Sequence, residues 1–96
     1  MISKKRLKSE IEGIVRKEIH SADVTNISVS EGTGADDEEI IRVHIVFDNK
    51  SRLVDAQESI KVMREVRERL EKIGEDRFPV VYYVAKSEAG KLAEAG

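Results

Sequence analysis

Two stretches of the chain repeat hydrophobic residues every three or four positions, which predicts two amphipathic helices. The first spans residues 3–20, and its apolar positions are Leu7, Ile11, Ile14, Val15 and Ile19. The second spans residues 55–73, and its apolar positions are Ile60, Met63, Val66, Leu70 and Ile73. Ser3 and Asp55 are the predicted N-caps, and Gly74 is the predicted stop after the second helix. Glu58, three residues after Asp55, resembles the second half of a capping box.

Gly13 falls in the middle of the first helical pattern. A glycine there costs about 1 kcal/mol relative to alanine, unless a neighbouring group packs so closely that no side chain fits.

Three other segments alternate hydrophobic and polar residues with a period of two, which predicts strands. Residues 23–30 set Thr25, Ile27 and Val29 against Asn26, Ser28 and Ser30. Residues 39–48 carry two complete faces: Ile41, Val43, Ile45 and Phe47 on one, and Ile40, Arg42, His44 and Val46 on the other. The turn-forming residues 31–39 between these strands predict an antiparallel hairpin. A third strand is expected from Phe78 to about Lys86.

The element order is therefore α-β-β-α-β. A right-handed crossover through the second helix makes the second and third strands parallel. We expect an α+β fold of the αββαβ two-layer sandwich type, with two helices on one face of a three-stranded mixed sheet. Residues 1–88 form the expected single domain, and residues 89–96 a flexible C-terminal tail.

Charged residues make up 38% of the chain but nearly cancel, with 17 basic against 19 acidic residues and a net charge of −2. This balance argues against a dedicated nucleic-acid coat protein, which would be basic. The chain contains no cysteine, which excludes disulfides and thiolate metal sites. It also shows neither the apolar core of a signal peptide nor an apolar run of about 18 residues, so we expect a cytoplasmic protein.

No pattern in the sequence predicts catalytic chemistry, a cofactor or a metal. The glycines of "EGTGADDEE" lie beside four consecutive acids, which would repel phosphate and lack the spacing of a calcium loop. His20 and His44 lie on different elements without metal-ligand spacing. We therefore expect a non-enzymatic protein.

The face of the sheet turned away from both helices is the first candidate site. Arg42 and His44 belong to it if the other face of their strand meets the helices. "VVYY" fits both phases of the third strand, so either Tyr82 or Tyr83 joins them. Such a mixed face suits self-association or another protein partner, and an ordinary solvated sheet face explains it equally well.

The second candidate site is the basic cluster Lys4, Lys5, Arg6 and Lys8. Cations in a first helical turn oppose the helix dipole, so a sequence tuned only for stability would place acids there. One interpretation is an RNA or ribosome contact through phosphates. The other is a solvated helix end, which is what most charge runs are.

The segment "GEDRFPVVYYVAKSEAG" resembles a family of small, uncharacterised bacterial proteins that share a G-x-D-x-F-P-V entry and an A-K-S-E exit around the last strand. This resemblance implies no activity. The αββαβ order alone is similar to type II KH-like domains, such as BolA-like proteins and ribosome-binding factor A, which implies RNA, ribosome or protein binding. The Gly-x-x-Gly of KH domains is missing, and the second helix lacks the break of ribosome-binding factor A, so no site residue carries over.

Overall fold

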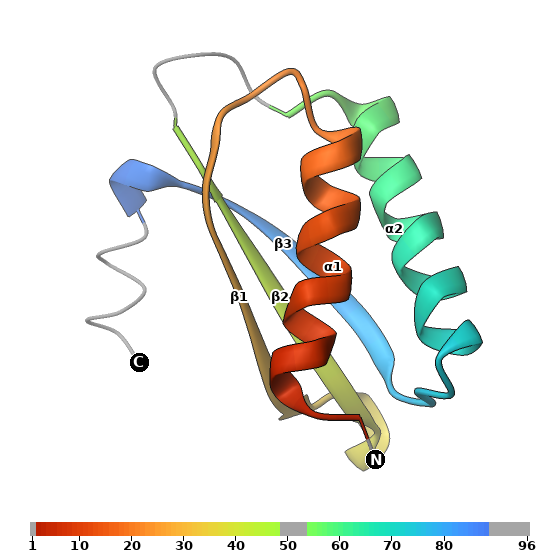
Figure 1. Cartoon of the computed structure of the whole chain (residues 1–96). Helices are drawn as coiled ribbons and strands as arrows, with labels where there is room; N and C mark the ends of the chain where they lie inside the picture. The colour runs from red at the N-terminus through yellow and green to blue at the C-terminus, as the bar shows by residue number, and fades with distance from the viewer. Residues whose placement is uncertain (1, 49–53, 89–96) are drawn as a thin grey trace.

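Two helices pack on one face of a three-stranded sheet (Figure 1). The computed structural model describes residues 2–48 and 54–88. The elements follow in the order α1 (Lys4–Glu18), β1 (Val24–Thr33), the short 3-10 turn η1 (Ala35–Asp37), β2 (Glu39–Phe47), α2 (Ala56–Lys72) and β3 (Phe78–Ala85). The predicted α+β fold and its αββαβ order are confirmed. The predicted C-terminal tail, residues 89–96, lies outside the described residues.

The strands lie in the order β1-β2-β3, with β2 in the centre. β1 and β2 form the expected antiparallel hairpin, and β3 runs parallel to β2 after the crossover through α2. Both outer strands therefore have one side without a strand neighbour among residues 2–48 and 54–88.

The core lies between the helices and one face of β2. Ile41, Val43 and Ile45 are completely shielded from solvent. The side chains that cover them come from both helices: Leu7, Ile11, Ile14 and Val15 of α1, and Val62, Val66 and Leu70 of α2. Burying each of these large aliphatic side chains contributes about 1.5–3 kcal/mol of transfer free energy.

The predicted buried face of α2 is wrong at its N-terminal end. Val62 is fully buried, whereas Ile60 is 58% exposed and Met63 is only half-buried. Residues two apart on a helix point to nearly opposite sides, so burying Val62 turns Ile60 outward. Val66, Leu70 and Ile73 do contact the core as predicted.

β1 also departs from the prediction at both ends. The strand continues through residues 31–33, which were expected in a turn, and the chain reverses only at Gly34–Glu38. A register shift between Val24 and Asn26 places Val24 against the core and leaves Thr25 exposed. A bulge of this kind breaks strict alternation, which explains why Thr25 does not share the face of Ile27.

The predicted N-caps and the stop at Gly74 are confirmed, whereas α1 ends at Glu18, two residues earlier than predicted. The Ser3 hydroxyl accepts a hydrogen bond from the Arg6 N–H (3.2 Å), and one Asp55 carboxylate oxygen accepts from the N–H groups of Gln57 (2.8 Å) and Glu58 (3.3 Å). Gly74 has φ +82°, the left-handed conformation that a C-terminal glycine supplies.

The capping box takes an indirect form. The Asp55 N–H donates to the Ser21 hydroxyl (2.9 Å), which in turn donates to the Glu58 carboxylate (2.6 Å). Ser21 therefore connects the two halves of the box and also ties the chain between α1 and β1 to the start of α2.

Replacing Gly13 and Gly74 by alanine should change the stability of the protein in opposite directions. A Cβ at Gly13 would meet no atom within 4 Å, so Gly13→Ala should raise the free energy of unfolding by about 1 kcal/mol. Gly74→Ala should lower it by about 1–2 kcal/mol, because an L-residue is strained at positive φ. Urea unfolding of the two variants beside the wild type tests both. A loss of stability in Gly13→Ala would contradict the open environment of that position.

Candidate functional site

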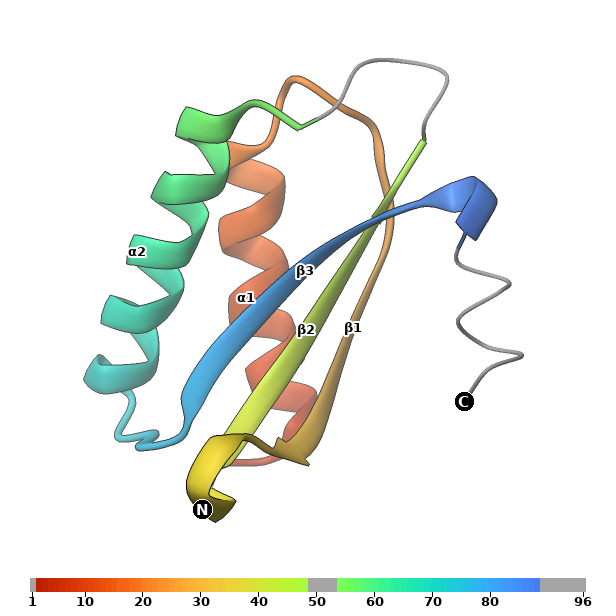
Figure 2. The same cartoon turned by 180° about the vertical axis from the view of Figure 1, so that it is seen from behind.

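The face of the sheet opposite the helices is built from four cross-strand rows, and Figure 2 shows this side of the sheet in front of the helices. Each row takes one residue from each strand in the order β1, β2, β3. The rows are Asn26–Val46–Val84, Ser28–His44–Tyr82, Ser30–Arg42–Val80 and Gly32–Ile40–Phe78. We call these residues the open sheet face.

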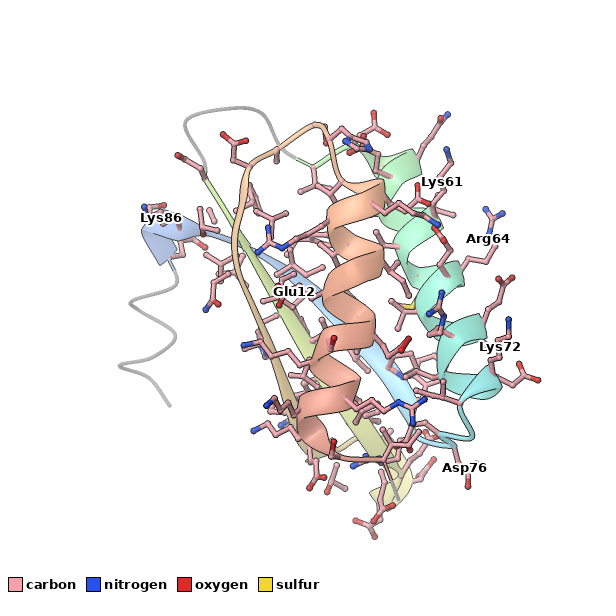
Figure 3. The ribbon with its side chains drawn as sticks, viewed as in Figure 1. Glu12, Lys61, Arg64, Lys72, Asp76 and Lys86 are labelled. Atoms are coloured by element: carbon pink, nitrogen blue, oxygen red, sulfur yellow. The ribbon has the colours of Figure 1, made fainter. Side chains whose placement is uncertain are left out.

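The open sheet face contains no aspartate, glutamate or lysine, and Arg42 is its one permanently charged residue. The helix layer is very different. Lys61, Arg64 and Lys72 of α2 project away from the sheet, as Figure 3 shows. A chain that is 38% charged thus keeps almost all of its charge off this face.

An aromatic pair lies in the middle of the face. His44 and Tyr82 are register partners on the parallel strands β2 and β3. Their rings are stacked, with centroids 5.0 Å apart and planes 16° from parallel. Tyr82 remains 43% exposed, so the pair presents a flat apolar surface with a polar group at each end.

Arg42 lies flat along the neighbouring strand. Its guanidinium covers Gly32, where a Cβ would come within 2.6 Å of Arg42 Cζ. One of its terminal nitrogens is 3.5 Å from the Thr33 carbonyl oxygen. Gly32 therefore leaves room for the guanidinium, which fixes the positive charge on the β1 side of the His44–Tyr82 pair. The sequence analysis missed this role of Gly32, and only the register between Gly32 and Ile40 identifies it.

The structure also decides between the two tyrosines. Tyr82 belongs to the open sheet face, whereas Tyr83 packs against the core on the helix side. Tyr83 is therefore not part of the candidate surface. Its hydroxyl is buried without a hydrogen-bond partner among residues 2–48 and 54–88, and this burial raises the pKa of the phenol to about 12.

The basic cluster lies elsewhere. Lys4, Lys5, Arg6 and Lys8 occupy the first turns of α1 and are exposed. No acidic residue shares the first turn of this helix. Because α1 belongs to the helix layer, the cluster and the His44–Tyr82 pair are on opposite sides of the molecule and do not form one site.

Two charged networks hold the elements together instead of forming a site. The Glu58 carboxylate accepts hydrogen bonds from the Ser21 hydroxyl and from the N–H groups of Ser21 and His20, which lowers the pKa of Glu58. Arg77 pairs with Glu75 and Glu31, both at 2.9 Å. The ion pair with Arg77 lowers the pKa of Glu75. The ion pair between Arg77 and Glu31 joins the entry of β3 to β1.

Within residues 2–48 and 54–88, no group of three or more His, Asp or Glu side chains is arranged to hold a metal ion. The acids of the β1–β2 turn are exposed, and Asp36 and Asp37 both have φ 57°. None of the helices in the same described residues is both long enough and apolar enough to cross a bilayer.

Comparison with known proteins adds no constraint. No protein-family model, curated protein or solved structure matches the chain.

The placement of Tyr83 has a measurable consequence for titration. In the variant Tyr82→Phe, Tyr83 is the single tyrosine that remains in the chain. Its phenol should ionise only near pH 12 rather than near the ordinary value of about 10. Burial favours the neutral phenol, so the stability that the buried Tyr83 side chain contributes is fully present below pH 10. This stability is lost as the pH rises towards 12. Tyrosinate absorbance measures the titration, with circular dichroism as a check that the fold persists. Ionisation near pH 10 in the folded protein would place Tyr83 at the surface.

Proposed function

We propose that this protein is a small non-enzymatic binding protein whose open sheet face docks a partner protein. The composition of that face carries the proposal. Protein interfaces are depleted in charged residues other than arginine, and enriched in aromatic residues and arginine. The open sheet face has no lysine, glutamate or aspartate and presents Tyr82, Phe78 and Arg42, although it also carries Ser28 and Ser30, and serine is another depleted type.

The geometry of the face supports a modest, reversible interface. Tyr82 is exposed, and Arg42 belongs to the next row, with its guanidinium over Gly32 in the row beyond. Tyrosine and arginine are the residue types that most often dominate binding energy when a partner covers them. The small side chains of Ser28 and Ser30 leave room for the partner's own side chains on the β1 side.

A nucleic acid is a poorer fit to this face. Single-stranded RNA or DNA needs a positively charged groove beside its stacking platform. Arg42 is the one permanent cation among the residues of the four rows, so little counterion release would accompany binding. A protein partner, itself or another, fits better. The cytoplasm is the proposed compartment, because the cysteine-free chain needs no oxidising environment.

A photo-crosslinking experiment tests the proposal. A photoreactive phenylalanine analogue replaces the exposed Ser28, which lies on β1 and far from the outer edge of β3. The same analogue at Glu12 or Lys72, on the outer surface of the helix layer, gives the matched controls (Figure 3). In native host cells, position 28 should give a discrete protein adduct that the controls do not give. Arg42→Glu in the same chain should reduce its yield several-fold.

Two results would contradict the proposal. One is an identical adduct pattern at all three positions. The other is an adduct at position 28 that Arg42→Glu leaves unchanged. Crosslinking of the purified chain at position 28 to a product of twice its 10.8 kDa mass would identify the partner on this face as a second copy.

A second candidate function is an RNA- or ribosome-associated module that uses the basic helix. One observation favours it: Lys5, Lys8 and Arg16 line a single hollow on α1, which extends the predicted basic cluster along the helix. Glu12 lines the same hollow and pairs with Arg16 at 3.4 Å, so Lys5 and Lys8 are the cations left for a phosphate backbone.

Fluorescence anisotropy with single-stranded and double-stranded RNA tests this candidate. If it is correct, affinity should fall steeply with the logarithm of salt concentration, and Lys5→Glu with Lys8→Glu should abolish binding. The control Tyr82→Ser should leave binding unchanged, because Tyr82 lies on the other side of the molecule. No binding at low salt would exclude this function.

A further inference from the structure

β3 leaves one long side of its backbone without a partner. It is an outer strand, and none of the described residues pairs with the side turned away from β2. Its sequence, FPVVYYVA, contains no charged residue across eight positions. Soluble proteins normally protect such an edge with charges, prolines, bulges or a very short strand, because unpaired strand edges bind other strands. Of these, β3 carries one proline, at its second position.

The opposite edge of the sheet is protected. β1 carries the register shift between Val24 and Asn26, and its sequence is rich in Thr, Asn, Ser and Glu. The contrast between the two edges confines strand pairing to β3.

Pro79 fixes which backbone groups of β3 are available. It has no N–H, and an edge strand tolerates proline where the missing donor faces away from its neighbour. Peptide groups alternate along a strand, so Val81 and Tyr83 also direct their N–H and C=O groups outward. Two complete donor–acceptor residues therefore face solvent in the middle of the strand.

The surface of α2 beside this edge is apolar in the N-terminal half of the helix. One side of α2 is tied to α1 by the Glu65–Lys17 and Arg69–Glu10 ion pairs, both at 2.8 Å. The side towards the edge of β3 is marked by Arg67, whose guanidinium lies 5.2 Å from the centre of the Phe78 ring. Seen from behind, α2 lies beyond β3 on the side away from β1 (Figure 2).

A groove of about 450 Å³ follows this side of α2. Ile60 and Met63 form its apolar part, and Ile60 is 58% exposed. The charged residues around them are evenly matched: Arg64, Arg67, Glu68 and Glu71.

We propose that a second copy of this chain docks here, with the two β3 strands paired antiparallel about a twofold axis to form one six-stranded sheet. The same axis sets the two α2 helices side by side and antiparallel, with Ile60 and Met63 of each copy at their contact. Two basic and two acidic residues make the groove rim neutral and self-complementary, which suits an identical partner better than a strongly charged one. In an isologous contact of this kind, the β3 edge of each copy pairs with that of the other, so no further copy can add and assembly stops at the dimer.

The symmetry restricts the register. Paired residues must lie on the same face of the sheet, so a residue of β3 can pair only with one of the same parity. A slip of one residue would place the helices of the two copies on opposite faces of the joined sheet, so the two α2 helices could no longer meet. The dimer also joins the two open sheet faces into one continuous surface. The inference does not rest on the proposed function, because the β3 edge and the open face are different surfaces.

Light scattering on the purified full chain, at low and high salt, tests the proposal. The expected mass is twice 10.8 kDa at both salts, because apolar and backbone contacts dominate the interface. Ile60→Lys places two like charges at the helix contact and should raise the dimer dissociation constant at least tenfold. Gln57→Lys adds the same charge one turn away, at an exposed position outside the groove, and should leave the mass unchanged.

Hydrogen exchange gives a second readout that does not depend on a variant. The amides of Val81 and Tyr83 should be protected at high protein concentration and exchange rapidly on dilution into the monomer. Arg42→Glu, on the open sheet face, should leave both the mass and this protection unchanged.

A monomer at all concentrations would overturn the inference, as would a dimer that Ile60→Lys leaves intact. A dimer that dissociates in Arg42→Glu but persists in Ile60→Lys would place self-association on the open sheet face instead. That outcome would contradict pairing through the β3 edge and would support docking on the open sheet face. The experiment therefore distinguishes failure of the dimer proposal from failure of the proposed function.

Discussion

The burial of one face of β2 is the constraint on which the rest of the structure depends. Ile41, Val43 and Ile45 are fully shielded, and the apolar stripes of both helices meet on them. Two helices of 15 and 17 residues can cover one face of a three-stranded sheet but not both. In the part of the chain that the structure describes, the uncovered face and the two free edges follow from this limit, so these surfaces are a direct result of how the core is formed.

The connections between the layers rely on hydrogen bonds more than on further apolar packing. Ser21 joins the end of the α1–β1 connection to the start of α2 through Asp55 and Glu58. At the other end of the sheet, Arg77 joins β3 to β1 through Glu31. Hydrogen bonds to a charged carboxylate are stronger than neutral ones. The Ser21 cluster therefore ties the α1–β1 connection to α2, and the Arg77 cluster ties the α2–β3 connection to β1.

The sequence predicts this fold well wherever one periodic pattern has a single solution. β2 alternates buried and half-buried residues from Ile41 to Phe47, and Ser3, Asp55 and Gly74 end the helices as their chemistry requires. Prediction of the buried side fails where two alternative phases of a helix or strand place equally apolar residues there. Ile60 and Met63 compete with Val62 for the buried side of α2, and only the position of α2 at the edge of the sheet decides between them.

The candidate surface shows the same division. Arg42 and His44 follow from the phase of β2 alone. Tyr82 does not, because "VVYY" is apolar in both phases and only the register of β3 against β2 pairs it with His44. Gly32 and Ser21 act through contacts distant in the sequence, and no local pattern could identify them.

The distribution of charge argues that the open surfaces are used. Exposed uncharged surface lowers solubility, and a chain with 38% charged residues has ample means to avoid it. The chain places Arg64, Glu68 and Glu71 around α2 and four acids in the β1–β2 turn. The four rows of the open sheet face nevertheless contain no lysine, glutamate or aspartate, and β3 carries no charged residue. A single lysine in β3 would block strand pairing at little cost to a partly exposed edge. Uncharged side chains on both surfaces are what the two proposed contacts would require.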